Sequence, residues 1–367
     1  MSPRIVTAAV FAVCVGFLFG FSSGEEPSAF SECADSFLST QEIVLDQSEQ
    51  LLGQLQSATR LPNARIVAST DDPGVFLFES DGTFVRQLGQ PGQGPFEYQN
   101  PTIVRAYKDH IAIWDAGNMK VTVYGDDGTD IEEWTGFTWS ITDFAIRDGV
   151  LYSYYGSLSA PYLRVWDLEA EEMIAEYDDA ESVERAVLTQ MEGSGSVSLH
   201  GDYLYALDPS NPAVHQYSLS DETETQLGID DDAFSIPSTD ASTVDELGFE
   251  EAMMFGMSSS RSYKVYALES SLLTVLQHGS VSYDAPLFDN GQPNPNARME
   301  SYDRYLHVYD MTHEGEVERC QRIDIDIEQA QSDHVLIGPA TDGFFFRTLE
   351  ETDTDIEYVL TEYSLPQ

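Results

Sequence analysis

The architecture of the chain can be inferred from Pro101–Trp134, which reads PTIVRAYKDHIAIWDAGNMKVTVYGDDGTDIEEW. This stretch predicts four short strands: Thr102–Tyr107, His110–Trp114, Lys120–Tyr124 and Thr129–Trp134. Each segment is rich in β-branched and aromatic residues, and turns rich in Asp and Gly separate them, which is typical of an antiparallel meander. Similar units recur along the chain, so this meander is the repeating module.

The spacing of the repeats indicates the architecture. The third strand of each predicted unit ends near an aromatic residue: Phe78, Tyr124, Trp166, Tyr217, Tyr309 and Tyr363. Most of these residues lie roughly 42 to 54 positions apart, and four-stranded units at such a period indicate a β-propeller. The gap between Tyr217 and Tyr309 is about twice as long. We interpret it as one unit with two insertions, and a hidden seventh blade is the alternative.

We therefore predict an all-β fold, a six-bladed β-propeller of four-stranded antiparallel blades. The blades are expected at about residues 51–88, 102–134, 141–177, 194–227, 262–323 and 334–363. The last unit has only three C-terminal strands, and residues 41–46 form a spare apolar strand near the other end of the chain. This strand is expected to join the last blade and to cover an edge that would otherwise favour aggregation.

Residues 1–24 have the pattern of a secretory signal. Arg4 precedes an almost wholly apolar stretch at 5–21, and small residues at 22–24 offer a cleavage site. We expect an exported protein, periplasmic or extracellular, whose residues 25–367 form a single propeller domain with no membrane span after cleavage. If the signal stays uncleaved, the stretch becomes an N-terminal membrane anchor, since it is nearly long enough to cross a bilayer.

Two cysteines, Cys33 and Cys320, remain once the signal is removed. An exported protein meets an oxidising environment, which favours a single long-range disulfide between them. Two unrelated buried thiols are the alternative.

The charge of the chain bears on its surroundings and partners. Asp and Glu number 64 against 17 Lys and Arg, which gives a formal net charge of −47. A field of this sign repels phosphate, so we expect no nucleic-acid partner. Only three basic residues are lysines, and the acidic residues are spread along the chain. This pattern favours the acidic surface of a halophilic protein over a patch aimed at a cationic partner.

Two motifs carry a resemblance to known proteins. Residues 76–82 (FLFESDG) and 83–98 (TFVRQLGQPGQGPFEY) resemble the strand, Asp-Gly turn, strand and Gly-rich exit of NHL-type repeats. Residues 115–118 (DAGN) and 120–124 (KVTVY) resemble the turn and following strand of the same family motif in the second unit. The chain thus resembles exported six-bladed propeller proteins of a Bacteroidetes-type family of unknown function. The resemblance implies a propeller and transfers no catalytic residue.

Loop lengths point to one face of the propeller. Connections between blades share a face with the loops between second and third strands, and the insertions 178–193, 229–260 and 278–302 all fall there. Helices are expected within 180–192 and 244–257. Binding residues gather on loops that a rigid scaffold carries, so we expect a pocket on this face. The alternative is that the insertions merely cover the mouth of the channel.

The candidate binding residues combine amide, guanidinium and aromatic groups, which suit a glycan or a peptide: Tyr98, Arg105, Asn118, Trp139, Arg147, Asn294, Arg298 and Tyr302.

Catalytic motifs are not found, because the seven histidines form no zinc-binding spacing and no Gly-x-Ser-x-Gly elbow occurs. The run Asp230–Asp232 lacks the glycine and terminal glutamate of a calcium loop. We favour a solvated turn there and expect no cofactor, with Ca²⁺ as the open alternative.

The sequence thus favours an exported, non-catalytic binding or scaffold propeller of a salt-adapted bacterium. Its partner is expected to be a glycan, a peptide or an envelope protein. Two other functions stay open: a metal-dependent, Ca-type propeller hydrolase or lyase whose ligands converge from several blades, and a structural component of the cell envelope.

The charge analysis predicts that the protein loses structure at low ionic strength, because salt screens the repulsion between its carboxylates. Thermal unfolding at about 0.05 M and about 3 M salt checks this, and the melting temperature should be clearly higher at the higher concentration. Equal melting temperatures would contradict salt adaptation.

Overall fold

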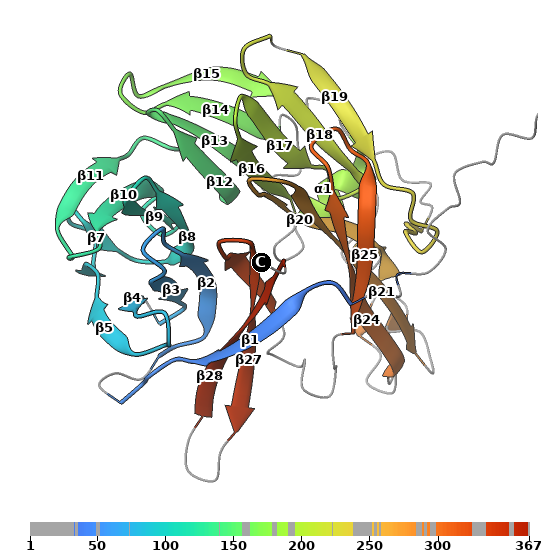
Figure 1. Cartoon of the computed structure of the whole chain (residues 1–367), viewed down its shortest axis with the longest axis horizontal. Helices are drawn as coiled ribbons and strands as arrows, with labels where there is room; N and C mark the ends of the chain where they lie inside the picture. Colours follow the sequence, from blue (N-terminus) through green and yellow to red (C-terminus); the bar gives the residue numbers. More distant parts are fainter. Residues whose placement is uncertain are drawn as a thin grey trace, which may run out of the picture.

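Antiparallel sheets of four strands follow one another around a ring in the computed structural model (Figure 1). The structure describes residues 33, 36–48, 52–72, 74–138, 140–155, 162–177, 182–189, 195–221, 223–237, 252, 255–256, 258–283, 288–289, 292–293, 299–324, 335–351 and 356–365. The predicted signal at 1–24 lies outside these residues.

The first three sheets take the chain order of a meander. Blade one contains β2 (Leu55–Arg60), β3 (Ile66–Thr70), β4 (Gly74–Phe78) and β5 (Phe84–Gln87). Blade two contains β8 (Pro101–Tyr107), β9 (His110–Asp115), β10 (Lys120–Gly125) and β11 (Asp130–Trp134). Blade three contains β12 (Ile141–Arg147), β13 (Val150–Tyr155), β14 (Leu163–Asp167) and β15 (Glu172–Tyr177).

The next two sheets repeat this order. Blade four contains β16 (Ser196–His200), β17 (Tyr203–Leu207), β18 (Ala213–Ser218) and β19 (Glu224–Gly228). Blade five contains β20 (Arg261–Ala267), β21 (Leu272–Tyr283), β24 (Met299–Met311) and β25 (Val317–Asp324). Blade six combines both ends of the chain: β26 (Val335–Pro339), β27 (Gly343–Glu351), β28 (Ile356–Ser364) and β1 (Ser39–Val44).

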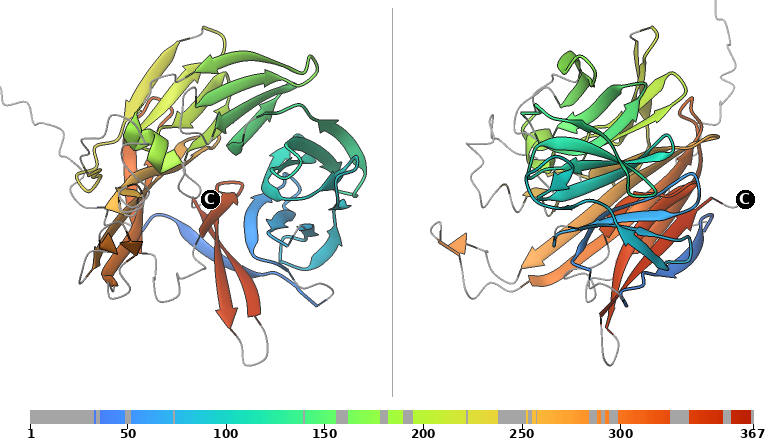
Figure 2. Two further views of the ribbon diagram at one scale, coloured as in Figure 1. Left: turned by 180° about the vertical axis from the view of Figure 1, so that it is seen from behind. Right: turned by 90° about the vertical axis from the view of Figure 1, so that its left-hand side faces the viewer.

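Small elements occupy the connections. The strands β6 (Gln90–Pro91) and β7 (Glu97–Tyr98) pair in parallel between blades one and two, and α1 (Val183–Thr189) lies between blades three and four. The short strands β22 (Phe288–Asp289) and β23 (Gln292–Pro293) pair near the tip of the β21–β24 hairpin, which reaches beyond the ring in the side view (Figure 2).

The prediction of an all-β, six-bladed propeller is confirmed. The alternative of a seventh blade between Tyr217 and Tyr309 is wrong, because β21 and β24 are neighbours in one sheet and pair along their whole length. The predicted loop at 278–302 is shorter than expected, because strands occupy both of its ends. The hairpin strands extend into it, since β21 runs to Tyr283 and β24 begins at Met299.

The hydrophobic core is divided among the interfaces between blades. In β4, the side chains of Phe76 and Phe78 pack toward blade six, while those of Val75 and Leu77 pack toward blade two. This alternation follows from the two-residue period of a strand, so a strand covered on both faces is apolar throughout. Comparable clusters fill the other interfaces in the described residues, and the outermost strands, such as β11 and β15, are largely exposed.

The N-terminal strand closes the ring, as predicted. β1 pairs antiparallel with β28, with Ile43 opposite Leu360, and Ile43 enters the cluster between blades six and one. A turn of blade one lies against the end of β1. At this turn Gly82 has a φ of 90°, and an added Cβ would stand 2.1 Å from the carbonyl oxygen of Val44. Only glycine fits such a close backbone approach.

The segment before β1 lies along blade five. Cys33 forms a disulfide with Cys320 of β25, with 4.8 Å between the Cα atoms. The backbone amides of Phe37 and Leu38 donate hydrogen bonds to the side-chain oxygen of Gln321, at 3.0 and 2.9 Å. The N-terminal segment therefore contacts blades five, six and one in succession.

The insertions contain the helix expected within 180–192, since α1 spans Val183–Thr189. The helix expected within 244–257 falls mostly on residues outside the described ones. In the part of the chain that the structure describes, no helix is both long enough and apolar enough to cross a bilayer.

The closure by β1 predicts that Ile43→Ala lowers the free energy of unfolding by about 2–5 kcal/mol, because Ile43 is 2% exposed and its loss leaves a cavity between two blades. The adjacent Val44 is 48% exposed, so Val44→Ala is the matched control and should change stability by less than about 0.5 kcal/mol. Urea denaturation measures both. Equal effects of the two substitutions would argue against a packed closing strand.

Candidate functional site

Charged side chains from the innermost strands of blades two, three and five meet near the axis of the ring. Arg105 of β8 forms an ion pair with Asp143 of β12, and the ammonium of Lys264 in β20 lies 3.7 Å from the other carboxylate oxygen. Ser196 of β16 donates its hydroxyl hydrogen bond to that same oxygen at 2.7 Å. These four residues thus join four consecutive blades, and we call them the axial network.

Burial and charge oppose each other in the axial network. Burial alone would raise the pKa of Asp143, but Arg105, Lys264 and the Ser196 hydroxyl outweigh it and hold that pKa below its ordinary value. Burial lowers the pKa of Lys264, and Asp143 partly offsets this. A buried carboxylate between two cations stays ionised and fixes the strands that carry it.

Tyr98 and Asn118, two of the candidate binding residues, serve local structure. The buried Tyr98 hydroxyl donates to the carbonyl oxygen of Leu88 at 3.0 Å and accepts a hydrogen bond from the Gln87 amide at 3.0 Å. The side-chain amide of Asn118 donates to Asp115 at 2.6 Å and to the Gly92 carbonyl at 3.0 Å. Both residues thereby hold the Gly-rich connection between blades one and two.

Arg147 lies on the face opposite the insertions, where the turns are short. Its guanidinium is 2.9 Å from Asp202, in the first turn of blade four, and also bonds the Gly201 carbonyl. An open pocket of about 470 Å³ lies there, lined by Arg147, Leu199, His200, Gly201 and Asp202. Arg147 is therefore separated from the insertion face on which sequence reasoning placed it.

Four further candidate binding residues have no described side-chain contacts. Trp139, Asn294 and Arg298 lie outside the described residues. Tyr302 belongs to β24 and pairs with Val281. Their role in binding stays a prediction.

Two of the insertions pack against each other. Val187 and Leu188 of α1 form a small core with Phe255, and Ile236 packs beside it. The connection between blades three and four therefore contacts the connection between blades four and five. This places the two insertions on the same face of the ring.

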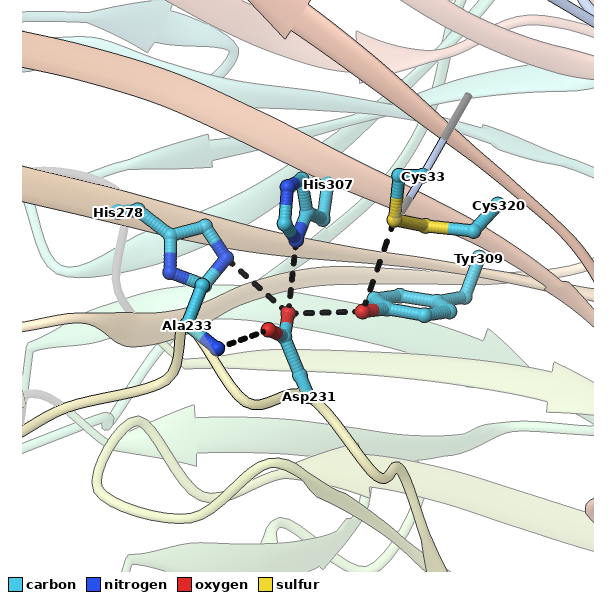
Figure 3. Close-up of a disulfide and its surroundings, with 7 residues drawn as sticks. All are labelled: Cys33, Asp231, Ala233, His278, His307, Tyr309 and Cys320. Carbon is cyan, nitrogen blue, oxygen red and sulfur yellow. Dashed lines mark hydrogen bonds and ion pairs between the residues drawn. A yellow bond between two sulfur atoms is a disulfide. The ribbon is translucent and has the colours of Figure 1, made fainter. Parts of the chain in front are cut away.

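A polar cluster lies where the 229–260 insertion crosses blade five (Figure 3). One oxygen of Asp231, Oδ2, is 3.2 Å from His278 Nε2 and 2.9 Å from His307 Nδ1. The Tyr309 hydroxyl donates to the same oxygen at 2.7 Å and lies 3.8 Å from Cys33 Sγ. The side chains of Asp231 and His278 are each 3% exposed and that of His307 is 11% exposed, so the cluster is nearly closed to solvent.

The pairing of β21 with β24 brings the two histidines together. His278 of β21 lies opposite Tyr305 of β24. His307 is two residues beyond Tyr305 on β24, so it lies on the same face of the sheet as His278. Tyr309 continues this face, and Cys320 lies opposite it on β25. The insertion after β19 then places Asp231 over the side chains of His278, His307 and Tyr309.

This cluster corrects one expectation from the sequence. The expected solvated turn at Asp230–Asp232 is wrong for Asp231, whose side chain is buried and faces two rings, although its neighbours are exposed. The spacing of the histidines along the chain indicates no zinc site, yet the fold brings His278, His307 and Asp231 together, with ligand atoms within 4.8 Å of one another. Local spacing gave no signal, since the cluster depends on the register of a long hairpin.

The environment controls the ionisation of the cluster. Burial would raise the pKa of Asp231, but the interactions with His278, His307 and Tyr309 outweigh it and hold the pKa far below its ordinary value. Burial, reinforced by Asp231, raises the pKa of Tyr309 well above its ordinary value. Asp231 is therefore a carboxylate and Tyr309 a neutral phenol at physiological pH.

Comparisons with known proteins agree with the fold. A family described as "6-bladed beta-propeller" (DUF5128) matches residues 30–170. A "Putative exported protein" of Bacteroides fragilis has a similar structure, with a TM-score of 0.62 and 17% identity over 92% of this chain and 97% of that one. A member of the duf4221 family from Bacteroides vulgatus gives a TM-score of 0.59 and 10% identity over 90% of this chain and 97% of that one. No curated protein matches the chain.

These similarities extend to the fold alone, because the identities are low and the family match covers less than half of the chain. The expected likeness to propellers of Bacteroides is confirmed at this level, and the NHL-like type of repeat stays a prediction.

The axial network predicts that Asp143→Asn lowers the free energy of unfolding by about 3–5 kcal/mol at neutral pH, because Arg105 and Lys264 lose their buried counter-charge. Asp148→Asn is the control, since Asp148 is 81% exposed and its loss should cost less than about 0.5 kcal/mol.

The effect also has a defined pH dependence. The pKa of Asp143 is lowered on folding, so its stabilising contribution is present above the ordinary aspartate pKa and is lost as the pH falls toward the folded value. The difference between wild type and Asp143→Asn should therefore shrink below about pH 4 in urea denaturation. A difference that grows in acid would contradict this assignment.

Proposed function

We propose that this protein is an exported, non-catalytic binding or scaffold propeller of a salt-adapted bacterium. Its ligand or partner is held on the face that carries the insertions 178–193, 229–260 and 278–302. Export is supported by the signal-like N-terminal sequence and by the name of the similar Bacteroides fragilis protein.

The observation that carries the proposal is the packing of the insertions on each other. Val187 and Leu188 of α1 share a core with Phe255, so two connections from different blade junctions form one continuous surface. The hairpin of β21 and β24 adds a projecting element beside them (Figure 2). Long loops that pack into a surface on a rigid ring are the usual site of recognition.

The opposite face is built differently. Its short turns are linked by ion pairs between neighbouring blades, such as Arg65 with Asp126 at 3.2 Å and Arg147 with Asp202 at 2.9 Å. These contacts fix one blade against the next and leave turns of minimal length. The contrast between the two faces supports a partner on the insertion face.

The axial network fits the structural support of a scaffold propeller. Asp143, the buried carboxylate among the four residues of that network, is paired with two cations and accepts hydrogen bonds from the Ser196 hydroxyl and from two backbone amides. A general acid or base needs a group that is free to exchange a proton near neutral pH, and a lowered pKa removes Asp143 from that range. The network instead holds the innermost strands together as a rigid support.

The charge of the chain restricts the partner. A net charge of −47 disfavours phosphorylated or otherwise anionic ligands, so we assign a glycan or peptide without anionic groups to the insertion face. An envelope protein that displays such a segment would satisfy the same requirement.

Site-specific photocrosslinking in the producing cells tests the proposal. A benzophenone side chain at Asp232, exposed on the insertion face, should give a cross-linked adduct with a partner. The same side chain at Asp127, exposed in a short turn of blade two, is the matched control and should give little. Adducts from Asp127 alone would overturn the assigned face, and adducts composed only of this chain would favour a structural envelope component.

A further inference from the structure

The cluster of Asp231, His278 and His307 is close in size to a metal site, with its three ligand atoms within 4.8 Å of one another. Zinc binds nitrogen and oxygen ligands at about 2.0–2.2 Å, which places tetrahedral ligand atoms about 3.3–3.5 Å apart. Asp231 Oδ2 lies 3.2 Å from His278 Nε2 and 2.9 Å from His307 Nδ1. Small side-chain shifts therefore suffice to admit an ion.

Neighbouring groups orient the ligands. The Ser260 hydroxyl lies 3.1 Å from His278 Nδ1, so that nitrogen can carry the proton and leave Nε2 free to coordinate. The backbone amide of Ala233 donates to Asp231 Oδ1 at 2.8 Å, which turns Oδ2 toward the rings. The Tyr309 hydroxyl donates to Oδ2 at 2.7 Å. Such outer partners are typical of metal-bound histidines and carboxylates.

Hydrogen bonds alone leave the cluster incompletely satisfied. Two ring nitrogens and one phenol surround Asp231 Oδ2, whereas one carboxylate oxygen offers about two lone pairs. His278 Nε2 is buried and makes no hydrogen bond of good geometry among the described residues, although it is within ion-pair distance of that oxygen. A buried polar atom without a proper partner carries a desolvation cost that a metal bond would remove.

We propose that Asp231, His278 and His307 bind a divalent transition metal ion of the zinc class. Two imidazole nitrogens and one carboxylate oxygen suit Zn²⁺ and related ions, whereas Ca²⁺ prefers an all-oxygen shell. The ion joins the 229–260 insertion to β21 and β24 of blade five. It thereby fixes the base of the insertion face beside the Cys33–Cys320 disulfide.

The test uses the purified protein with its disulfide intact. This condition matters because Cys33, His307 and Cys320 also lie within ligand distance of one another, so free thiols would provide a competing site. Chelator-treated protein is titrated with Zn²⁺ by calorimetry, and with Co²⁺ by visible absorption, which reports four-coordinate geometry. The expected result is a tight site for about one ion per chain, with a higher melting temperature at saturating Zn²⁺.

Substitutions then assign the site. His278→Ala and His307→Ala should each weaken Zn²⁺ binding by about 100-fold or more, since each removes a ligand. The control is His200→Ala, because His200 and His313 form another histidine pair, with ring centroids 4.4 Å apart. It should leave the affinity unchanged. Circular dichroism and mapping of the disulfide confirm that each variant folds.

Milder variants keep the test decisive if a ligand variant does not fold. Tyr309→Phe and Ser260→Ala preserve the three ligands and remove one orienting hydrogen bond each, so each should weaken Zn²⁺ binding by about 10- to 100-fold. Failure of the folded wild type to bind Zn²⁺ would overturn the proposal and leave a hydrogen-bonded cluster. Binding that is lost in His200→Ala and kept in His278→Ala would overturn it as well.

Discussion

A ring of blades depends on its last interface, because each blade buries both faces against its neighbours and none has a complete core of its own. Here that interface is formed by the two ends of the chain. β1 pairs with β28, and Ile43 packs with Leu360 and Phe345 against blade one. The same N-terminal segment is bonded to Cys320 and hydrogen-bonded to Gln321 of blade five. Closure therefore combines strand pairing, apolar burial and one covalent bond, and these act on three consecutive blades.

The inner and outer parts of the ring use charge in different ways. Near the axis, a buried carboxylate is paired with both Arg105 and Lys264, so each cation has a counter-charge where water is scarce. Outside, acidic residues greatly outnumber basic ones, and their repulsion is left to the solvent to screen. The fold thus concentrates much of its scarce positive charge on positions that hold blades together. Arg65 and Arg147, which link neighbouring turns, follow the same pattern.

Most of the architecture could be predicted from local sequence. Turns such as Asp126–Gly128 mark strand ends, and the missing strand of the last blade identified the segment around Ile43 as its complement. The cluster around Asp231 could not be predicted, because it depends on how far β21 and β24 continue into a region that looks like a loop. Only their register brings His278 and His307 to one face, and a separate connection supplies Asp231. The pairing of Arg105 with Asp143 likewise joins different blades, so no spacing rule describes it.

The disulfide has a topological consequence. Together with the peptide backbone between Cys33 and Cys320, it makes a covalent circle that contains the first four blades and nearly all of the fifth. A protease that cuts once inside this circle, for example in an insertion, releases no fragment and only opens the circle at a new place. The cut protein keeps every blade attached, so a single cleavage in a long loop does not dismantle the ring.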